Sequence, residues 1–362
     1  MNLTKPLQWA ASITAIATLL TYTKIIPATL SNIILVLLFT ILYLIFNYKR
    51  SGFSLHALIP IILSLGIVII NKDPSMVSLI LLWIMYDIFK NATINTQVVA
   101  KSFFITGISG YIITLIAYFT VHLNQHADLV MWRINKLITR SSLGFQQPNT
   151  SMMYALAIIL SMILAYKMNW TKTILTIAVI TGLYHFNQSR TSFILIIMVL
   201  LLNQLKISWP CPRLIFAITA ITSYILMVIP INDSVNQLLS GRLSLYQSYN
   251  SLLGIHLLAN PIAESKMLDN SYVQMILSKG IIFTIVFMIS IIFIMKTKST
   301  KGKIITLAYV LSAFTETTFL HFELLFPLLL ACLAIEPNNI KEGNPQINDS
   351  NNTFNLNNRS RL

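Results

Sequence analysis

The amino-acid sequence predicts an all-α polytopic membrane protein. Of its 362 residues, 56% are hydrophobic and only 10% are charged, and the mean hydropathy is +0.73. A soluble globular domain has about 25% charged residues, whereas a membrane-spanning helix needs about 20 mostly apolar residues. Apolar runs cover most of the chain. We therefore expect a single transmembrane domain at 1–335, followed by a disordered cytoplasmic tail at 336–362 that is rich in Asn and Ser.

Apolar runs separated by polar connections predict about twelve transmembrane helices. The first run is expected to be a retained helix, because no small-residue cleavage site follows it. Two connections are much longer than a turn, at about 122–149 and at 231–270 between helices 9 and 10, and loops of this length are usually functional. Apolar residues at helical spacing over 238–258 predict a short helix in the second loop. The runs are 6–22, 25–46, 53–71, 75–90, 102–121, 150–166, 172–188, 191–206, 213–230, 271–295, 303–319 and 321–335.

The basic residues orient these helices. Lys and Arg number 25 against 11 Asp and Glu, which gives a net charge of +14. Most of the basic residues fall in alternate short connections, and one connection alone carries Lys296, Lys298, Lys301 and Lys303. Since cytoplasmic loops have the excess of Lys and Arg, both termini are expected inside, and the charge is expected to meet lipid headgroups of the bilayer. Nucleic acid is not an expected partner.

Four arginines depart from this rule, because they lie in segments assigned to the outer face. They are Arg133, Arg140, Arg190 and Arg242. Guanidinium is always charged and binds phosphate oxygens bidentately, so outer arginines indicate an anionic substrate such as a lipid-linked phosphate or diphosphate. For Arg190 the alternative is a side chain that only reaches out to lipid phosphate.

Polar residues also stand where two of the helices begin. Pro148-Asn149 and Asp269-Asn270 each directly precede or open an apolar run, and these residue types suit a helix start. A capping role would not exclude a catalytic role for Asp269. Glu264 is the other carboxylate of this part of the second loop, and either one is a candidate base.

In sequence order, these segments resemble the O-antigen polymerase and ligase family, which includes capsular and exopolysaccharide polymerases. The resemblance covers about 140–285. Three differences favour a polymerase over a ligase: Gln147 stands where the family often has His, Asp269 stands where ligases have His, and the spacing from Arg242 to Gly254 is one residue longer than a pattern of some polymerases. The matching motifs are R-x3-G-F-x-x-P-N at 140–149, Ser189-Arg190-Thr191, Gly241-Arg242, Asn260-Pro261, Asp269-Asn270-Ser271-Tyr272 and Gly280.

The resemblance implies a glycosyltransferase of the bacterial cytoplasmic membrane. It would join undecaprenyl-diphosphate-linked repeat units on the outer leaflet, beside a flippase and a chain-length regulator, and it would need neither metal nor cofactor. Asp269, Arg242 and Arg190 would be catalytic. Substrate would be bound by Arg140, Arg133, Tyr246, Tyr249, Asn270, Tyr272 and Glu264.

A transporter is the main alternative from another class. Asp87, Glu316 and Glu323 lie in expected helices, with His321 nearby, and ionisable residues within a membrane are functional candidates by default. They are the groups that a proton-coupled flippase or exporter of lipid-linked oligosaccharide would use. A non-catalytic scaffold is a third possibility, and an O-antigen ligase is the nearest alternative enzyme. The two cysteines, Cys211 and Cys332, indicate neither a disulfide framework nor a metal site.

Overall fold

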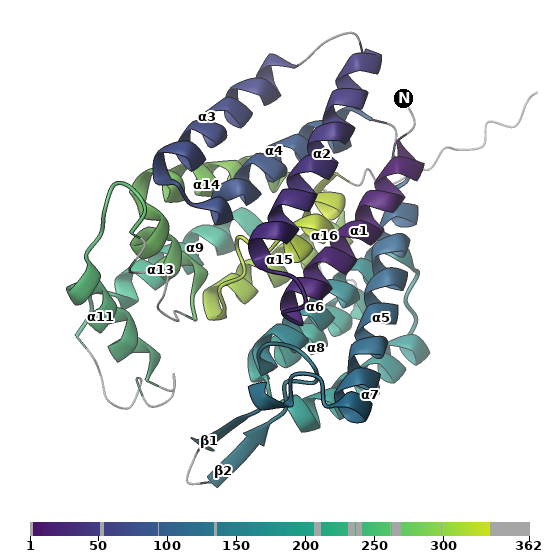
Figure 1. Cartoon of the computed structure of the whole chain (residues 1–362), viewed down its shortest axis with the longest axis vertical. Coiled ribbons are helices and arrows are strands. Elements are labelled where there is room, and N and C mark those ends of the chain that lie inside the picture. Colours follow the sequence, from purple (N-terminus) through teal and green to yellow (C-terminus); the bar gives the residue numbers. More distant parts are fainter. Residues whose placement is uncertain are drawn as a thin grey trace, which may run out of the picture.

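The computed structural model is a bundle of helices with one small hairpin (Figure 1). It describes residues 3–50, 54–92, 94–133, 136–205, 211–230, 236, 241–260, 262, 269–297 and 299–333. Every apolar run of the sequence coincides with a helix. The longer helices are α1 (Thr4–Tyr22), α2 (Ala28–Arg50), α3 (Leu55–Asn71), α4 (Val77–Asn91), α5 (Thr96–Val121), α6 (Pro148–Ala165), α7 (Trp170–Asn187), α8 (Arg190–Leu205), α9 (Pro212–Leu226), α11 (Arg242–Leu253), α14 (Gly280–Ile294), α15 (Thr300–Thr315) and α16 (Phe322–Leu333). Short elements are η1 (Pro74–Met76), η2 (Gln125–Ala127), β1 (Leu129–Arg133), β2 (Lys136–Arg140), α13 (Ser271–Gln274) and η3 (Met275–Lys279).

Four stretches of the described chain are both long and apolar enough to cross a membrane. They are Ala28–Lys49, Thr96–Val121, Pro148–Ala165 and Ser271–Ile294. Several shorter apolar helices accompany them, α3, α8, α9 and most of α16. A helical membrane protein is therefore supported, and twelve crossings stay a prediction.

Helix ends assigned by charge to the same face of the membrane contact one another. At the end of the molecule that holds the N-terminus, Lys301 Nζ at the start of α15 donates to Ile163 O near the end of α6 at 2.7 Å, and Arg213 Nε at the start of α9 donates to Met295 O at 3.1 Å. The β-hairpin lies at the opposite end (Figure 1), which we call the hairpin end. There the Gln146 amide donates to Tyr22 O at the end of α1.

The hairpin is an element that the sequence interpretation missed. Residues 122–149 were expected to form a loop, but Leu129–Arg133 and Lys136–Arg140 pair as antiparallel strands, with Leu129 opposite Arg140. Val130, Ile138 and Thr139 are β-branched, which favours extended backbone. The pairing places Arg140 at the base of the hairpin, next to the helices.

The predicted tenth helix is interrupted near its start. It begins as α13, makes the π-helical turn η3 over Met275–Lys279, and continues as α14. Gly280 has φ +83°, and a Cβ there would lie 2.5 Å from Leu258 O. Only glycine therefore allows the backbone of the second outer loop to approach so closely. Such π-turns often occur at functional sites, and this one ends on the buried Lys279.

Candidate functional site

Arg140 is held at the hairpin end by backbone and side-chain oxygens. Its position at the end of β2 directs the guanidinium inward, and the residue is only 8% exposed. Nε donates to Asn187 O at 3.3 Å, and NH2 donates to Asn149 Oδ1 at 2.6 Å. A buried guanidinium needs such partners. Arg140, which has no acidic neighbour in sequence, therefore takes its partners from the first turn of α6 and the last residue of α7.

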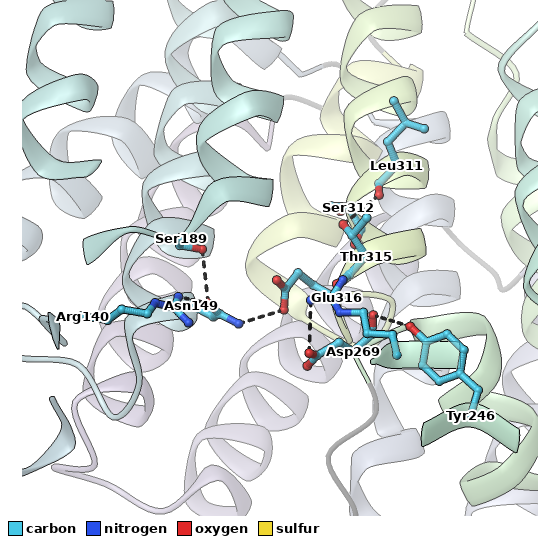
Figure 2. Close-up of polar contacts among 10 residues, drawn as sticks. Arg140, Asn149, Ser189, Tyr246, Asp269, Leu311, Ser312, Thr315 and Glu316 are labelled. Atoms are coloured by element: carbon cyan, nitrogen blue, oxygen red, sulfur yellow. Dashed lines mark hydrogen bonds and ion pairs between the residues drawn. The ribbon is translucent and has the colours of Figure 1, made fainter. Parts of the chain in front are cut away.

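Asn149 connects three segments through its side chain (Figure 2). Its Oδ1 accepts from Arg140 and from Ser189 Oγ, the latter at 3.3 Å, and its Nδ2 donates to Glu316 Oε2 at 3.3 Å. The helix start predicted here is present, with Pro148 at the first position of α6 and Gln147 as the N-cap residue. Proline suits the first helical position, where a backbone N–H would have no partner within the helix. The Asn149 side chain is thereby left to join the arginine to a carboxylate.

Glu316 is the buried carboxylate of the site. It was expected within an apolar span, but α15 ends at Thr315 and Glu316 begins the connection to α16. Burial and the charge of Asp269 raise its pKa, while Arg242, Arg140 and the Asn149 hydrogen bond lower it. The net result is a pKa of about 7. Both protonation states are therefore populated near neutral pH, which suits a group that must take up or release a proton.

Arg242 and Asp269 form an ion pair on the other side of Glu316. Arg242 is the first residue of α11, the short helix predicted in the second loop, and its NH2 lies 3.1 Å from Asp269 Oδ2. NH1 donates to Thr315 O at 3.2 Å, directly before Glu316. The two side chains are 26% and 39% exposed. Because water reaches this pair, a phosphate oxygen could replace the Asp269 carboxylate as the partner of Arg242.

We call these five residues, Arg140, Asn149, Arg242, Asp269 and Glu316, the arginine–carboxylate cluster. Asn149, Asp269 and Glu316 lie in one row in Figure 2, with Arg140 at one end. The residues come from β2, α6, the start of α11, the segment before α13 and the connection after α15. Arg140 and Glu316 thus lie in one site although they are more than 170 residues apart in sequence.

Several predicted substrate-binding residues instead support the fold around the cluster. Asn270 caps α13 by accepting from the amides of Tyr272 and Val273, which is the predicted capping role. Tyr272 is fully buried, with its hydroxyl 2.7 Å from Thr219 Oγ1. This placement differs from the expected contact with substrate, because no face of the Tyr272 ring is accessible.

The two tyrosines of α11 are also partly or wholly packed. Tyr246 is 3% exposed, and its hydroxyl donates to Asp269 O at 3.3 Å. Burial raises the pKa of Tyr246 to about 12, so it is a hydrogen-bond donor at neutral pH and positions the residue that pairs with Arg242. Tyr249 packs beside it against a small apolar cluster. Tyr246 therefore acts on the site through Asp269.

Three other predicted site residues lie at the margin of the cluster or outside the described residues. Arg190 is exposed at the start of α8, directly after Ser189, and within the described chain no hydrogen bond or ion pair engages its guanidinium. Arg133 ends β1, and its side chain lies outside the described part. Glu264 also lies outside the described residues.

The cluster has the chemistry of an anion site with an attached proton acceptor. Arg140 and Arg242 face two carboxylates, and the exposed Arg190 adds a third positive charge nearby. Among the described residues, no group of three His, Cys, Asp or Glu side chains could hold a metal ion.

Sequence reasoning missed the roles of Glu316 and Asn149 in this cluster and of Ser189 as a partner of Asn149. Glu316 was recognised only as a carboxylate in an apolar run. The signal that could have identified Glu316 as a site residue was its charge near the end of an apolar run, since ionisable residues at such positions are functional candidates.

Comparisons of the chain with models of known protein families, with curated proteins and with solved structures find no match in any of the three.

Proposed function

We propose that this protein is a glycosyltransferase that polymerises lipid-linked oligosaccharide repeat units at the outer leaflet of a bacterial cytoplasmic membrane. The donor is a glycan on undecaprenyl diphosphate, and the acceptor is the terminal sugar of another lipid-linked repeat. The single observation that carries the proposal is that two arginines meet two carboxylates at the hairpin end: Arg242 pairs with Asp269, and Arg140 is linked to Glu316 through Asn149. The resemblance of residues 140–285 to O-antigen polymerases points to the same chemistry.

The charge of the site suits a diphosphate leaving group. Breaking the bond between the anomeric carbon and the diphosphate oxygen leaves negative charge on that oxygen, and preorganised cations stabilise it. Arg242 is held by Thr315 O while its other nitrogen faces the partly exposed Asp269. Diphosphate binding would exchange the Asp269 carboxylate for a phosphate oxygen without moving the arginine far. Arg190, which is exposed at the start of α8, would bind the second phosphate.

Glu316 is the better base of the two described carboxylates. The acceptor hydroxyl attacks the anomeric carbon, the carbon–diphosphate bond breaks, and the hydroxyl proton must leave. Asp269, one of the two candidate bases expected from sequence, is paired with Arg242, whereas the pKa of Glu316 of about 7 matches the task at neutral pH. Direct displacement of this kind inverts the anomeric centre, and retention in the product linkage would exclude it.

The test is cell-surface glycan from a deletion strain that carries wild type, Arg242→Ala or Arg242→Lys. We expect Arg242→Ala to lose long chains and to accumulate single lipid-linked repeats on the outer leaflet. A loss of about 100-fold in transfer rate is the usual effect of removing one such donor. Arg242→Lys keeps the charge but not the bidentate geometry, so it should recover only part of the activity.

Lys24→Gln is the matched control, because Lys24 is an exposed cation at the hairpin end, just after α1, and lies outside the arginine–carboxylate cluster. It should leave chain length unchanged at equal membrane level. Long chains from Arg242→Ala would sink the proposal. Repeat units trapped on the inner leaflet would instead identify a flippase, the alternative suggested by the buried carboxylates. Asp87→Asn and Glu323→Gln would then be expected to reproduce that defect.

A further inference from the structure

A second polar site lies behind the connection that carries Glu316. It is a cavity of about 230 Å³ between α1, α2, η1, α4, the α13–η3 segment and residues 317–323. We call it the polar cavity. Its lining is unusual for the interior of an apolar bundle, because side-chain hydroxyl and amide groups come from five different elements. These groups belong to Thr18, Thr21, Ser31, Asn32, Ser75, Ser78, Ser271, Gln274 and Thr317.

A buried cluster of three titratable side chains forms one wall of the cavity. The Tyr22 hydroxyl donates to Glu323 Oε1 and contacts His321 Nδ1, and His321 Nδ1 lies 3.1 Å from Glu323 Oε1. Glu323 is 3% exposed, while the His321 side chain is 26% exposed. The cluster therefore offers a fixed acceptor and an accessible ring nitrogen to a ligand. None of these groups takes part in the arginine–carboxylate cluster.

The positive charge in the cavity wall is already neutralised. Lys279 Nζ lies 2.7 Å from Asp73 Oδ2 and 2.5 Å from Ser75 Oγ, and the lysine is 1% exposed. Burial raises the pKa of Asp73, but the attraction of Lys279 and the hydrogen bonds from Ser75 outweigh burial, so the pKa lies below its ordinary value. The Asp73 carboxylate is consequently ionised at neutral pH, and it offsets the charge of the lysine that it binds. An anion would gain little here and would meet Glu323.

The cavity matches an uncharged group with many hydroxyls. A water takes about 30 Å³ of liquid volume, so the space admits roughly seven waters or one sugar ring. Phe322 also lines it, and the apolar face of a sugar ring packs on aromatic side chains. We infer that the polar cavity binds one neutral sugar ring of the acceptor glycan, through Tyr22, His321, Glu323 and the surrounding hydroxyl and amide groups.

The connection 316–321 joins this cavity to the arginine–carboxylate cluster. Ser271 lines the cavity, and its Oγ donates to Glu316 O at 2.7 Å and accepts from the Thr318 amide at 2.6 Å. One side of this connection thus presents the Glu316 carboxylate to the arginines, and the other side presents Thr317 and His321 to the cavity. An acceptor ring in the cavity would lie across this connection from the proposed base. The acceptor assignment rests on the proposed function.

Sugar binding can be tested on the purified full-length protein in lipid nanodiscs. The probes are the neutral methyl glycosides of glucose, galactose, mannose, N-acetylglucosamine and N-acetylgalactosamine, with methyl glucuronide as an anionic comparison. Saturation-transfer NMR measures which of them bind. We expect saturation of at least one neutral glycoside and little of the glucuronide. Tyr22→Phe should weaken binding roughly tenfold, since it removes a hydrogen-bonding hydroxyl from the wall, and Ser31→Phe should abolish binding by filling the cavity.

Tyr111→Phe is the matched control. Tyr111 is another buried tyrosine of the bundle, and its hydroxyl pairs with Ser151 away from the cavity. Its glycoside signals should equal those of wild type, and unchanged melting temperatures would show that all three variants fold. Absence of saturation in wild type, or signals that survive both Tyr22→Phe and Ser31→Phe, would overturn the inference.

The cell assay with Arg242→Ala separates the two proposals. If that variant makes long chains while glycosides still bind in the cavity, polymerisation fails and the acceptor role fails with it. Sugar binding itself would stand in that case. If long chains are lost but no glycoside binds, polymerisation stands and the cavity assignment fails.

Discussion

The arginine–carboxylate cluster and the polar cavity are neighbours with opposite electrostatic designs. In the cluster, Arg242 and Asp269 are partly exposed, and the nearby Arg190 is exposed. In the cavity, Lys279 is buried and fully paired with Asp73. Available positive charge selects an anion, whereas internally neutralised charge and many hydroxyls select a neutral polar group. Two substrates of different charge can thus meet at one connection, residues 316–321.

The sharpest way to break this comparison is Glu316→Gln. If Glu316 is the base at the junction of the two sites, the rate of transfer in membranes should rise with pH between about 6 and 8, because only the deprotonated carboxylate accepts a proton and its pKa is about 7. The glutamine variant should lose about 100-fold or more and should show no such rise. Transfer assays over this pH range measure both effects, and a fully active variant would remove Glu316 from the chemistry.

The ion pair of Lys279 and Asp73 in the cavity wall can be tested by replacing one partner. Lys279→Met should destabilise the protein by about 3–5 kcal/mol, because it leaves the Asp73 carboxylate largely buried without its partner. Asp73→Asn combined with Lys279→Met should recover most of that loss. Thermal unfolding in detergent, followed by tryptophan fluorescence, measures both. Equal melting temperatures for the single and double variants would show that Lys279 and Asp73 do not neutralise each other's charge.

Ionic strength should distinguish the two sites by a smaller effect. Raising the salt concentration from 0.1 M toward 1 M shortens the screening length from about 10 Å to about 3 Å. Binding of the anionic donor to the partly exposed arginines should therefore weaken by a few-fold, while neutral glycosides in the cavity should bind unchanged. Donor titrations and the NMR signals at the two salt concentrations make the comparison. A parallel fall in both would contradict the assignment of anion and sugar to separate sites.

Much of the fold could be predicted because apolar composition and helix boundaries are local properties. The apolar runs coincide with the helices, the short helix predicted in the second loop is α11, and Pro148 and Asn270 stand at the helix starts where their chemistry suits them. The hairpin was missed because strand pairing joins two short segments, and neither is stable alone. The candidate site was predicted in part. Arg140, Arg242 and Asp269 lie in it, while Tyr272 is packed in the core.

The sequence by itself determined the membrane class, the helices and the unusual arginines, since each follows from residue type and spacing along a short stretch. Only the tertiary structure decided the partners. Arg140 meets Asn149, Asn149 meets Glu316, and Tyr22 meets His321 and Glu323 about 300 residues further along the chain. No local pattern encodes such pairs. In the low dielectric of the bundle interior an unpaired polar group is costly, so each buried polar group needs a partner. Which partner it has depends on the groups that the packing of the helices brings next to it.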